Sequence, residues 1–273
     1  MNPIENANNS DSLAFLFGLA MVAFVLLLII EKRKPYLHFP QKTYKESFVT
    51  NTTAFLFNNV ILTALKASSL FLVAQQFATH GILSSLADGP VKWLLAFLLF
   101  DLAIYAWHFA SHKYEWLWRF HKIHHSDKCF NVSTGFRFHV FDIMLEIAYK
   151  CIFVIVIGVD AYIVLSIEII ELFFIFFHHA NIRVPFETFV SQLIITPSLH
   201  RTHHSTSRKE HDSNYGIVLS FWDRMFNTRN ELAPQNIGLD LIEADNFVQL
   251  FSLAFITERK IMKLFGLIPK GKK

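Results

Sequence analysis

An uncharged apolar run near the N-terminus constrains the fold of this chain more than any other feature. Leu13 to Ile30 holds 18 residues without a charge, enough for a helix to cross the hydrocarbon layer of a membrane. Glu5 and Asp11 precede the run, and Glu31 followed by the basic residues 32–34 comes after it. Because a cleaved signal peptide has the opposite order of charges, the run is predicted to be a permanent first span.

The rest of the chain also fits a membrane protein. Its 273 residues are 53% hydrophobic and include 30 Phe, which is more apolar than an ordinary soluble domain. The basic cluster places residues 31–47 on the cytoplasmic side. Further spans are expected at 53–75 and from Val91, followed by a helical hairpin over 140–177 that breaks at residues 158–160. The predicted fold class is an all-α membrane bundle of three spans plus a hairpin, with a cytoplasmic histidine-rich helical cap.

We expect a single domain over residues 1–273. Residues 1–90 form N-terminal membrane helices, 91–230 a histidine-rich core and 231–273 a C-terminal cytoplasmic tail. Cys129 and Cys151 are too few for a disulfide framework or a thiolate metal site. A net charge of +3 on a chain with membrane spans gives no reason to expect nucleic acid as a partner.

Histidines form three tight groups along the chain. The groups are His108 with His112; His121 with His124 and His125; and His200 with His203 and His204. With 14 His in the chain, an HxxHH pattern is expected about 0.03 times by chance, and it occurs twice. Residues three and four apart share a helix face, so each group presents its imidazoles in one direction. This pattern predicts a metal centre, and so many His without Cys suggest two ions with open coordination.

The expected topology places all three groups on the same side of the membrane. The hairpin ends at His178 and His179 on that side, and Glu171 lies two helical turns before His178 on the same face. A carboxylate there can accept a hydrogen bond from a metal-bound imidazole, although pairing with another charge is the alternative. His211, beside Asp212, is expected to be a solvated loop residue.

The residues that carry these groups resemble a known family. Asp101 to Asp142 reads DLAIYAWHFASHKYEWLWRFHKIHHSDKCFNVSTGFRFHVFD, and Phe177 to Thr228 reads FHHANIRVPFETFVSQLIITPSLHRTHHSTSRKEHDSNYGIVLSFWDRMFNT. Residues 93–230 resemble the fatty acid hydroxylase and sterol desaturase superfamily of integral-membrane di-iron oxygenases. The eight-histidine signature of this family matches His108, His112, His121, His124, His125, His200, His203 and His204. The best match for a further ligand is His179, with His178 as the competing choice.

The resemblance also implies residues that support the ligands. His139, in Arg137-Phe138-His139, is a ligand or, as we favour, such a supporting residue. The other expected supporting residues are His178, Asp212, Asn214 and Glu171. The segments 214–216 and 222–224 match a downstream signature. Departures from the family pattern at Phe109, Val140, Asp142 and Asn227 weaken any transfer of substrate identity.

The activity implied by the resemblance is hydroxylation of an unactivated C–H bond of a lipid by two iron ions, with O2 as co-substrate and zinc as a substitute metal. A desaturase with the same centre is an alternative. A membrane metal transporter or sensor without catalysis is the alternative from another class, but its ligands would lie near the bilayer midplane.

Electrons are expected from a separate donor, because the chain has no dinucleotide fingerprint or Cys set for an iron–sulfur cluster. A ferredoxin or a protein of the cytochrome b5 type would serve. Basic surface residues that dock this donor or contact anionic lipid are Lys113, Arg119, Lys122, Arg208 and Lys209. The membrane is a bacterial inner membrane or the endoplasmic reticulum.

Overall fold

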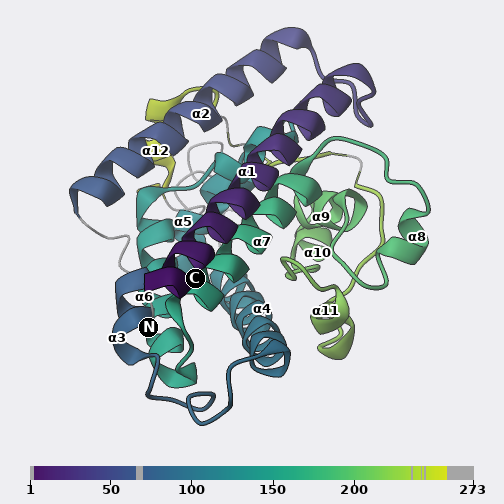
Figure 1. The fold of residues 1–273 in the computed structure, drawn as a ribbon. Coiled ribbons are helices and arrows are strands. Elements are labelled where there is room, and N and C mark those ends of the chain that lie inside the picture. The colour runs from purple at the N-terminus through teal and green to yellow at the C-terminus, as the bar shows by residue number, and fades with distance from the viewer. Residues whose placement is uncertain (1–2, 66–69, 235, 241, 243, 257–273) are drawn as a thin grey trace, which may run out of the picture.

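Helices make up the regular structure of this protein (Figure 1). The computed structural model describes residues 3–65, 70–234, 236–240, 242 and 244–256. Within these ranges there is no β-strand, and extended pairing is limited to two isolated bridges, Ile194 with Leu219 and Ser205 with Ile237. The predicted all-α class is therefore confirmed.

Within the part of the chain that the structure describes, three helices are long and apolar enough to cross a membrane. They are α1 (Pro3–Arg33, apolar from Asp11 onward), α4 (Pro90–Lys113) and α7 (Ala161–His179). In Figure 1, α1 crosses the molecule diagonally in front of α7, against which it packs. Much of its apolar surface faces outward, as at Phe15, which is 67% exposed. Such a surface is typical of a helix that faces lipid.

The structure describes the expected single span at 53–75 only in part, as two helices on either side of residues 66–69, which lie outside the described residues. These are α2 (Gln41–Ala64) and α3 (Leu70–Phe77), neither of which is long and apolar enough to count as a span. Polar side chains explain the difference, because α2 buries them against protein. Asn58 donates to the Phe138 carbonyl at 2.9 Å, and Asn51 donates to Ser133 at 3.0 Å in the short helix η1 (Val132–Phe136).

The expected hairpin is present as α6 (Val140–Ile157) and α7, joined at Gly158. Gly158 has a φ of 63°, a left-handed conformation that lets the chain reverse. Lys150 on α6 bonds Glu168 and Glu171 on α7 at 2.7 and 3.0 Å. For Glu171, this contact is the pairing with another charge that the sequence left open as the alternative. Because α6 carries three charged residues, α7 is the arm that qualifies as a span.

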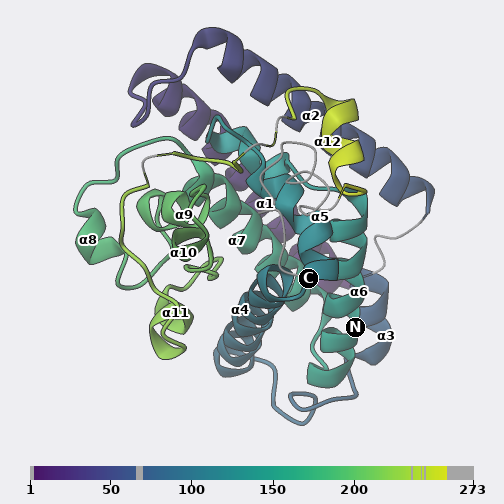
Figure 2. The same ribbon diagram turned by 180° about the vertical axis from the view of Figure 1, so that it is seen from behind.

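A cap of short helices covers one end of this bundle. It contains α5 (Glu115–His125), α8 (Glu187–Val190), α9 (Pro197–His203), α10 (Arg208–His211), α11 (Phe221–Met225) and α12 (Phe247–Leu253). Figure 2 shows α12 beside α2, with α5 below them. Leu250 of α12 is buried with Trp118 and Ile123 of α5. The expected C-terminal tail thus packs into the cap up to Ile256, and residues 257–273 lie outside the described residues.

Candidate metal centre

Nine buried histidines converge where α4, α5, α7 and α9 meet. The first group takes one ligand atom from each of five residues, His108, His112, His121, His125 and His203, all within 4.8 Å of one another. The second group takes one from each of four residues, His124, His179, His200 and His204, within the same limit. The structure thus brings together all nine histidines that the sequence predicted as ligands, and it divides them into two groups.

In the first group, hydrogen bonds at Nδ1 fix the orientation of the imidazole rings. The Nδ1 atoms of His108 and His203 lie 2.9 and 2.6 Å from the backbone carbonyls of Tyr215 and Ser213. Those of His112 and His121 lie 3.4 and 3.1 Å from the carboxylates of Asp212 and Asp142. An Nδ1–H that donates to such an acceptor leaves Nε2 as a lone pair. Among the described residues, none of these four Nε2 atoms has a hydrogen-bond partner.

In the second group, the Nε2 atoms lie close to one another. His179 Nε2 is 3.1 Å from that of His124 and 2.9 Å from that of His200, and His204 Nε2 is 3.2 Å from that of His200. His179 Nδ1 lies 2.7 Å from the Ile175 carbonyl, to which it donates. Facing lone pairs repel unless a proton or a cation lies between them. One shared metal ion would satisfy all four nitrogens.

Burial keeps the imidazoles neutral. It is the largest cause that lowers the pKa of His124, His125, His200, His203 and His204 below the ordinary value of 6.5, and neighbouring histidines lower it further. A neutral imidazole offers its lone pair to a metal at pH 7 without first losing a proton. The all-imidazole donor sets suit iron, zinc or copper, and they lack the oxygen ligands that magnesium and calcium prefer.

A model of the fatty acid hydroxylase family matches residues 93–228, the segment that contains both groups. The chain belongs to this family. It is 28% identical to the ornithine lipid hydroxylase OlsE of Rhizobium tropici, over 97% of the chain and 82% of that protein. It is 33% identical to human alkylglycerol monooxygenase over 52% of the chain, but this match spans 31% of the human protein. It is 24% identical to mouse cholesterol 25-hydroxylase, over 53% of the chain and 49% of that protein. No solved structure matched.

In this member of the fatty acid hydroxylase family, the downstream signature, residues 214–216 and 222–224, holds the first group in place. Asp223 accepts hydrogen bonds from the backbone of Tyr215 and Gly216 at 2.8 and 2.9 Å, and so fixes the carbonyl that accepts from His108. Asn214, with a φ of 53°, donates to the Leu199 carbonyl of α9 at 2.9 Å. These contacts explain why both segments accompany the histidines.

Three of the predicted supporting residues lie near the groups. Asp212 contacts His112, as noted above, and Asn214 anchors α9. His178 is fully buried with its ring centroid 3.9 Å from that of His200, yet it belongs to neither group. His139 is placed differently. It caps α6 by accepting from the Phe141 amide at 3.3 Å, and it packs against Phe251.

Other expectations need correction. Glu171 bonds Lys150, and within the described residues no hydrogen bond joins it to His178, because the lysine lies between three carboxylates of the hairpin. His211 is not solvated: it is buried and stacks on Trp118, 5.4 Å between ring centroids. Lys122 is buried too, with its ammonium bonded to the Ile256 carbonyl, so it cannot belong to a basic surface.

Asp142 is the supporting residue that sequence reasoning missed. In the sequence it stands out only as a departure from the family pattern. The structure places it in the first turn of α6, where its carboxylate and the imidazole of His121 are both nearly inaccessible to solvent. A carboxylate at the first turn, 21 residues after a histidine, carries no periodic signal that would have revealed this pairing.

Proposed function

We propose that the protein is an integral-membrane lipid hydroxylase whose nine histidines hold two iron ions. The relatives of this chain are named as hydroxylases and monooxygenases, and those names include an ornithine lipid, an alkylglycerol and cholesterol. The observation that carries the proposal is the convergence of two all-imidazole groups inside the segment that matches the family. Iron bound there would activate O2 for insertion of one oxygen atom into a C–H bond of the lipid.

The chain itself supplies positioning and exclusion of water. Asp142 and Asp212 orient His121 and His112, so that each ring presents Nε2 to the centre. Phe138 stacks on His124 with ring centroids 4.4 Å apart and covers the second group on one side. Since the nine histidines are all at most 5% exposed, bulk water is kept from the reacting centre.

The centre faces the cytoplasm in this proposal. Glu31, near the basic end of α1, accepts from the Asn181 amide at 3.1 Å, just after α7 ends at His179. The basic end of α1 and the histidines of α7 therefore lie at the same end of the bundle. The excess of basic residues there marks the cytoplasmic side.

A separate donor of the ferredoxin or cytochrome b5 type supplies the electrons. Arg208 is exposed and bonds Asp212 at 3.2 Å, and Asp212 in turn contacts His112 of the first group. This short connection from the surface to the metal centre, with Lys209 exposed beside it, favours a docking site for an acidic donor on α10.

Comparative lipid mass spectrometry tests the proposal in cells that express the wild type, His203→Ala or the control His80→Ala. His80 is exposed and lies far along the chain from the nine ligands. We expect a lipid product heavier by about 16 Da, the mass of one oxygen atom, in the wild type and the control, and its loss together with iron in His203→Ala. Iron-free protein with full activity would refute the proposal.

The product mass separates one alternative, and measurements of iron flux and O2 consumption separate the other. A product lighter by about 2 Da would identify a desaturase. Iron that moves across the membrane without consumption of O2 would identify a transporter instead.

A further inference from the structure

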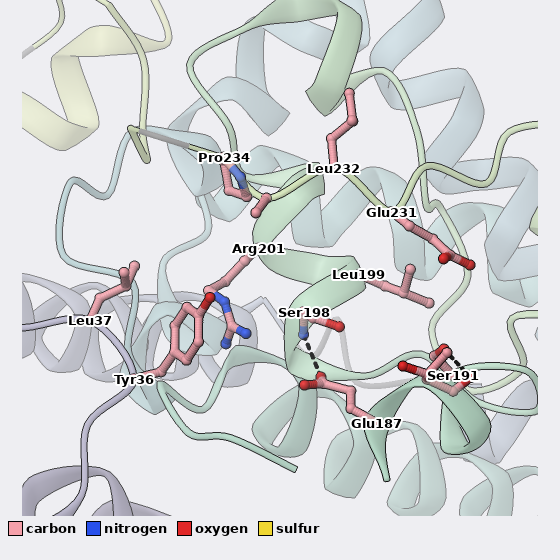
Figure 3. Close-up of a pocket in the computed structure, with 12 residues that line it drawn as sticks. Tyr36, Leu37, Glu187, Ser191, Ser198, Leu199, Arg201, Glu231, Leu232 and Pro234 are labelled. Atoms are coloured by element: carbon pink, nitrogen blue, oxygen red, sulfur yellow. Dashed lines mark hydrogen bonds between the residues drawn. The ribbon is translucent and has the colours of Figure 1, made fainter. Parts of the chain in front are cut away.

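A second polar site lies beside the metal centre, on the other side of α9. It is a cavity of 240 Å³ between the segment that follows α1 and the helices α8 and α9 (Figure 3). Tyr36, Glu187, Ser198, Arg201 and Leu232 are among the residues that line it. None of them takes part in either histidine group, although Arg201 directly follows His200 on α9.

The cavity contains a buried cation without a carboxylate partner. Arg201 is 3% exposed, and its guanidinium lies 4.0 Å from the centroid of the Tyr36 ring, as the stacked side chains in Figure 3 show. It donates to the Ile182 carbonyl at 3.3 Å. In the described part of the chain, no carboxylate lies within ion-pairing distance of it. The negative charge of Glu187 acts on Arg201 from beyond that distance. A buried charge is costly unless it is directly paired, so this arginine favours an anion in the cavity.

A carboxylate lines the same cavity. Glu187 accepts from the Ser198 amide at 2.8 Å (Figure 3), which fixes its position at the start of α8. Glu231, also at the cavity, is already paired with Arg229 at 2.7 Å. The cavity therefore presents a cation and an anion that do not neutralise each other by direct contact.

We propose that this cavity binds the zwitterionic headgroup of the lipid substrate, with its phosphate or carboxylate at Arg201 and its ammonium group at Glu187. The inference rests on the proposed function and narrows the substrate class to lipids with an ionic headgroup. Given about 30 Å³ for each water molecule in the liquid, the 240 Å³ cavity has room for a headgroup of about eight non-hydrogen atoms. The acyl chains remain outside.

The rim of the cavity indicates a lipid ligand and not a soluble one. Phe186 and Phe189 flank Glu187 and are 84% and 73% exposed, and Leu232 on the opposite side is 58% exposed. Exposed aromatic side chains next to a polar cavity are suited to the membrane interface. Tyr36 lies three residues after Arg33, where the first span ends. The cavity thus opens at the depth of lipid headgroups.

Binding titrations on the purified, metal-loaded protein in detergent test the proposal. The probes are dihexanoyl phosphatidylethanolamine, Nα-lauroyl-lysine, dihexanoylglycerol and free O-phosphoethanolamine. We expect one or both zwitterionic lipids to bind at least about tenfold more tightly than the neutral glyceride, as charge-assisted hydrogen bonds require. Arg201→Gln should abolish this preference, and the control Arg119→Gln, an exposed arginine on α5, should retain it.

A second variant gives a distinct signature and guards against misfolding of Arg201→Gln. Glu187→Gln keeps the oxygen that accepts from Ser198 but removes the charge, so it should weaken binding of phosphatidylethanolamine and strengthen binding of dihexanoyl phosphatidic acid. Equal affinity for the neutral glyceride in the wild type would overturn the proposal. Binding of O-phosphoethanolamine as tight as that of the lipid would overturn the assignment to a lipid.

The titration is repeated on His203→Ala. Binding that persists there separates the headgroup site from the metal chemistry, so that each proposal fails independently of the other.

Discussion

The carboxylate of Asp142 provides the sharpest test of the proposed metal centre. Its Oδ2 lies 3.1 Å from His121 Nδ1, and the two side chains are 4% and 6% exposed. Water therefore cannot replace the carboxylate when it is removed. Loss of such a partner behind a metal-bound histidine weakens metal affinity about 10- to 100-fold, or about 1.4–2.7 kcal/mol. We expect Asp142→Ala to reach the upper part of this range, and Asp142→Asn, which keeps an acceptor oxygen, to lose about tenfold or less.

Chelator competition with ferrous ion measures these affinities, and thermal unfolding of the same samples reports whether the variants fold. Asp88→Ala is the matched control, because Asp88 is 87% exposed and pairs with Lys92 in the first turn of α4. In a double-mutant cycle, Asp142→Ala should have little further effect once His121 is Ala, since the two act through one hydrogen bond. Folded Asp142→Ala with wild-type affinity, or full additivity in the cycle, would refute the reasoning.

Three further predictions concern stability and assembly. In the metal-free protein, the buried histidines of α5 and α9 have a lowered pKa, so the unfolded state binds more protons than the folded state below pH 6.5. Each histidine should therefore lower the free energy of unfolding by up to about 1.4 kcal/mol for each pH unit below 6.5. A melting temperature that stays constant between pH 7.5 and 5.5 would contradict this. Gly158→Ala should destabilise the fold strongly, because the new Cβ would lie 1.8 Å from the His80 carbonyl oxygen at a φ of +63°. In the control Gly18→Ala, the new Cβ meets nothing within 4 Å. Thermal unfolding of both variants tests this prediction. Asp223→Asn leaves one backbone amide without its acceptor, at a cost of about 1–3 kcal/mol, and it should lower metal occupancy less than Asp142→Ala does, as metal analysis can show.

The sequence predicted the elements whose signals are local. The span from Val91, the break at residues 158–160 and the three histidine groups could all be predicted from short patterns. The span at 53–75 could not be judged in this way, because the polar residues of α2 are accommodated by a distant segment around Phe138. The burial of His211 depends likewise on Trp118, which lies 93 residues earlier in the chain and meets it only in the folded protein.

The division of the nine histidines could not be predicted either. Adjacent residues on a helix point about 100° apart, so His124 and His125 enter different groups, as do His203 and His204. Which direction leads to which group depends on how α5 and α9 are packed against α4 and α7. That packing is a property of the whole bundle and not of the motif.

The exchange of histidines between the two groups has a consequence for loading. From α5, the pair spaced by four residues goes to the first group and His124 to the second; from α9, the pair spaced by four goes to the second group and His203 to the first. In the proposed two-ion centre, neither ion could therefore enter or leave without moving a helix that also holds the other. We expect filling to be cooperative, with both ions acquired at one midpoint in a titration and no stable half-filled form; two well-separated midpoints would show that the helices move independently.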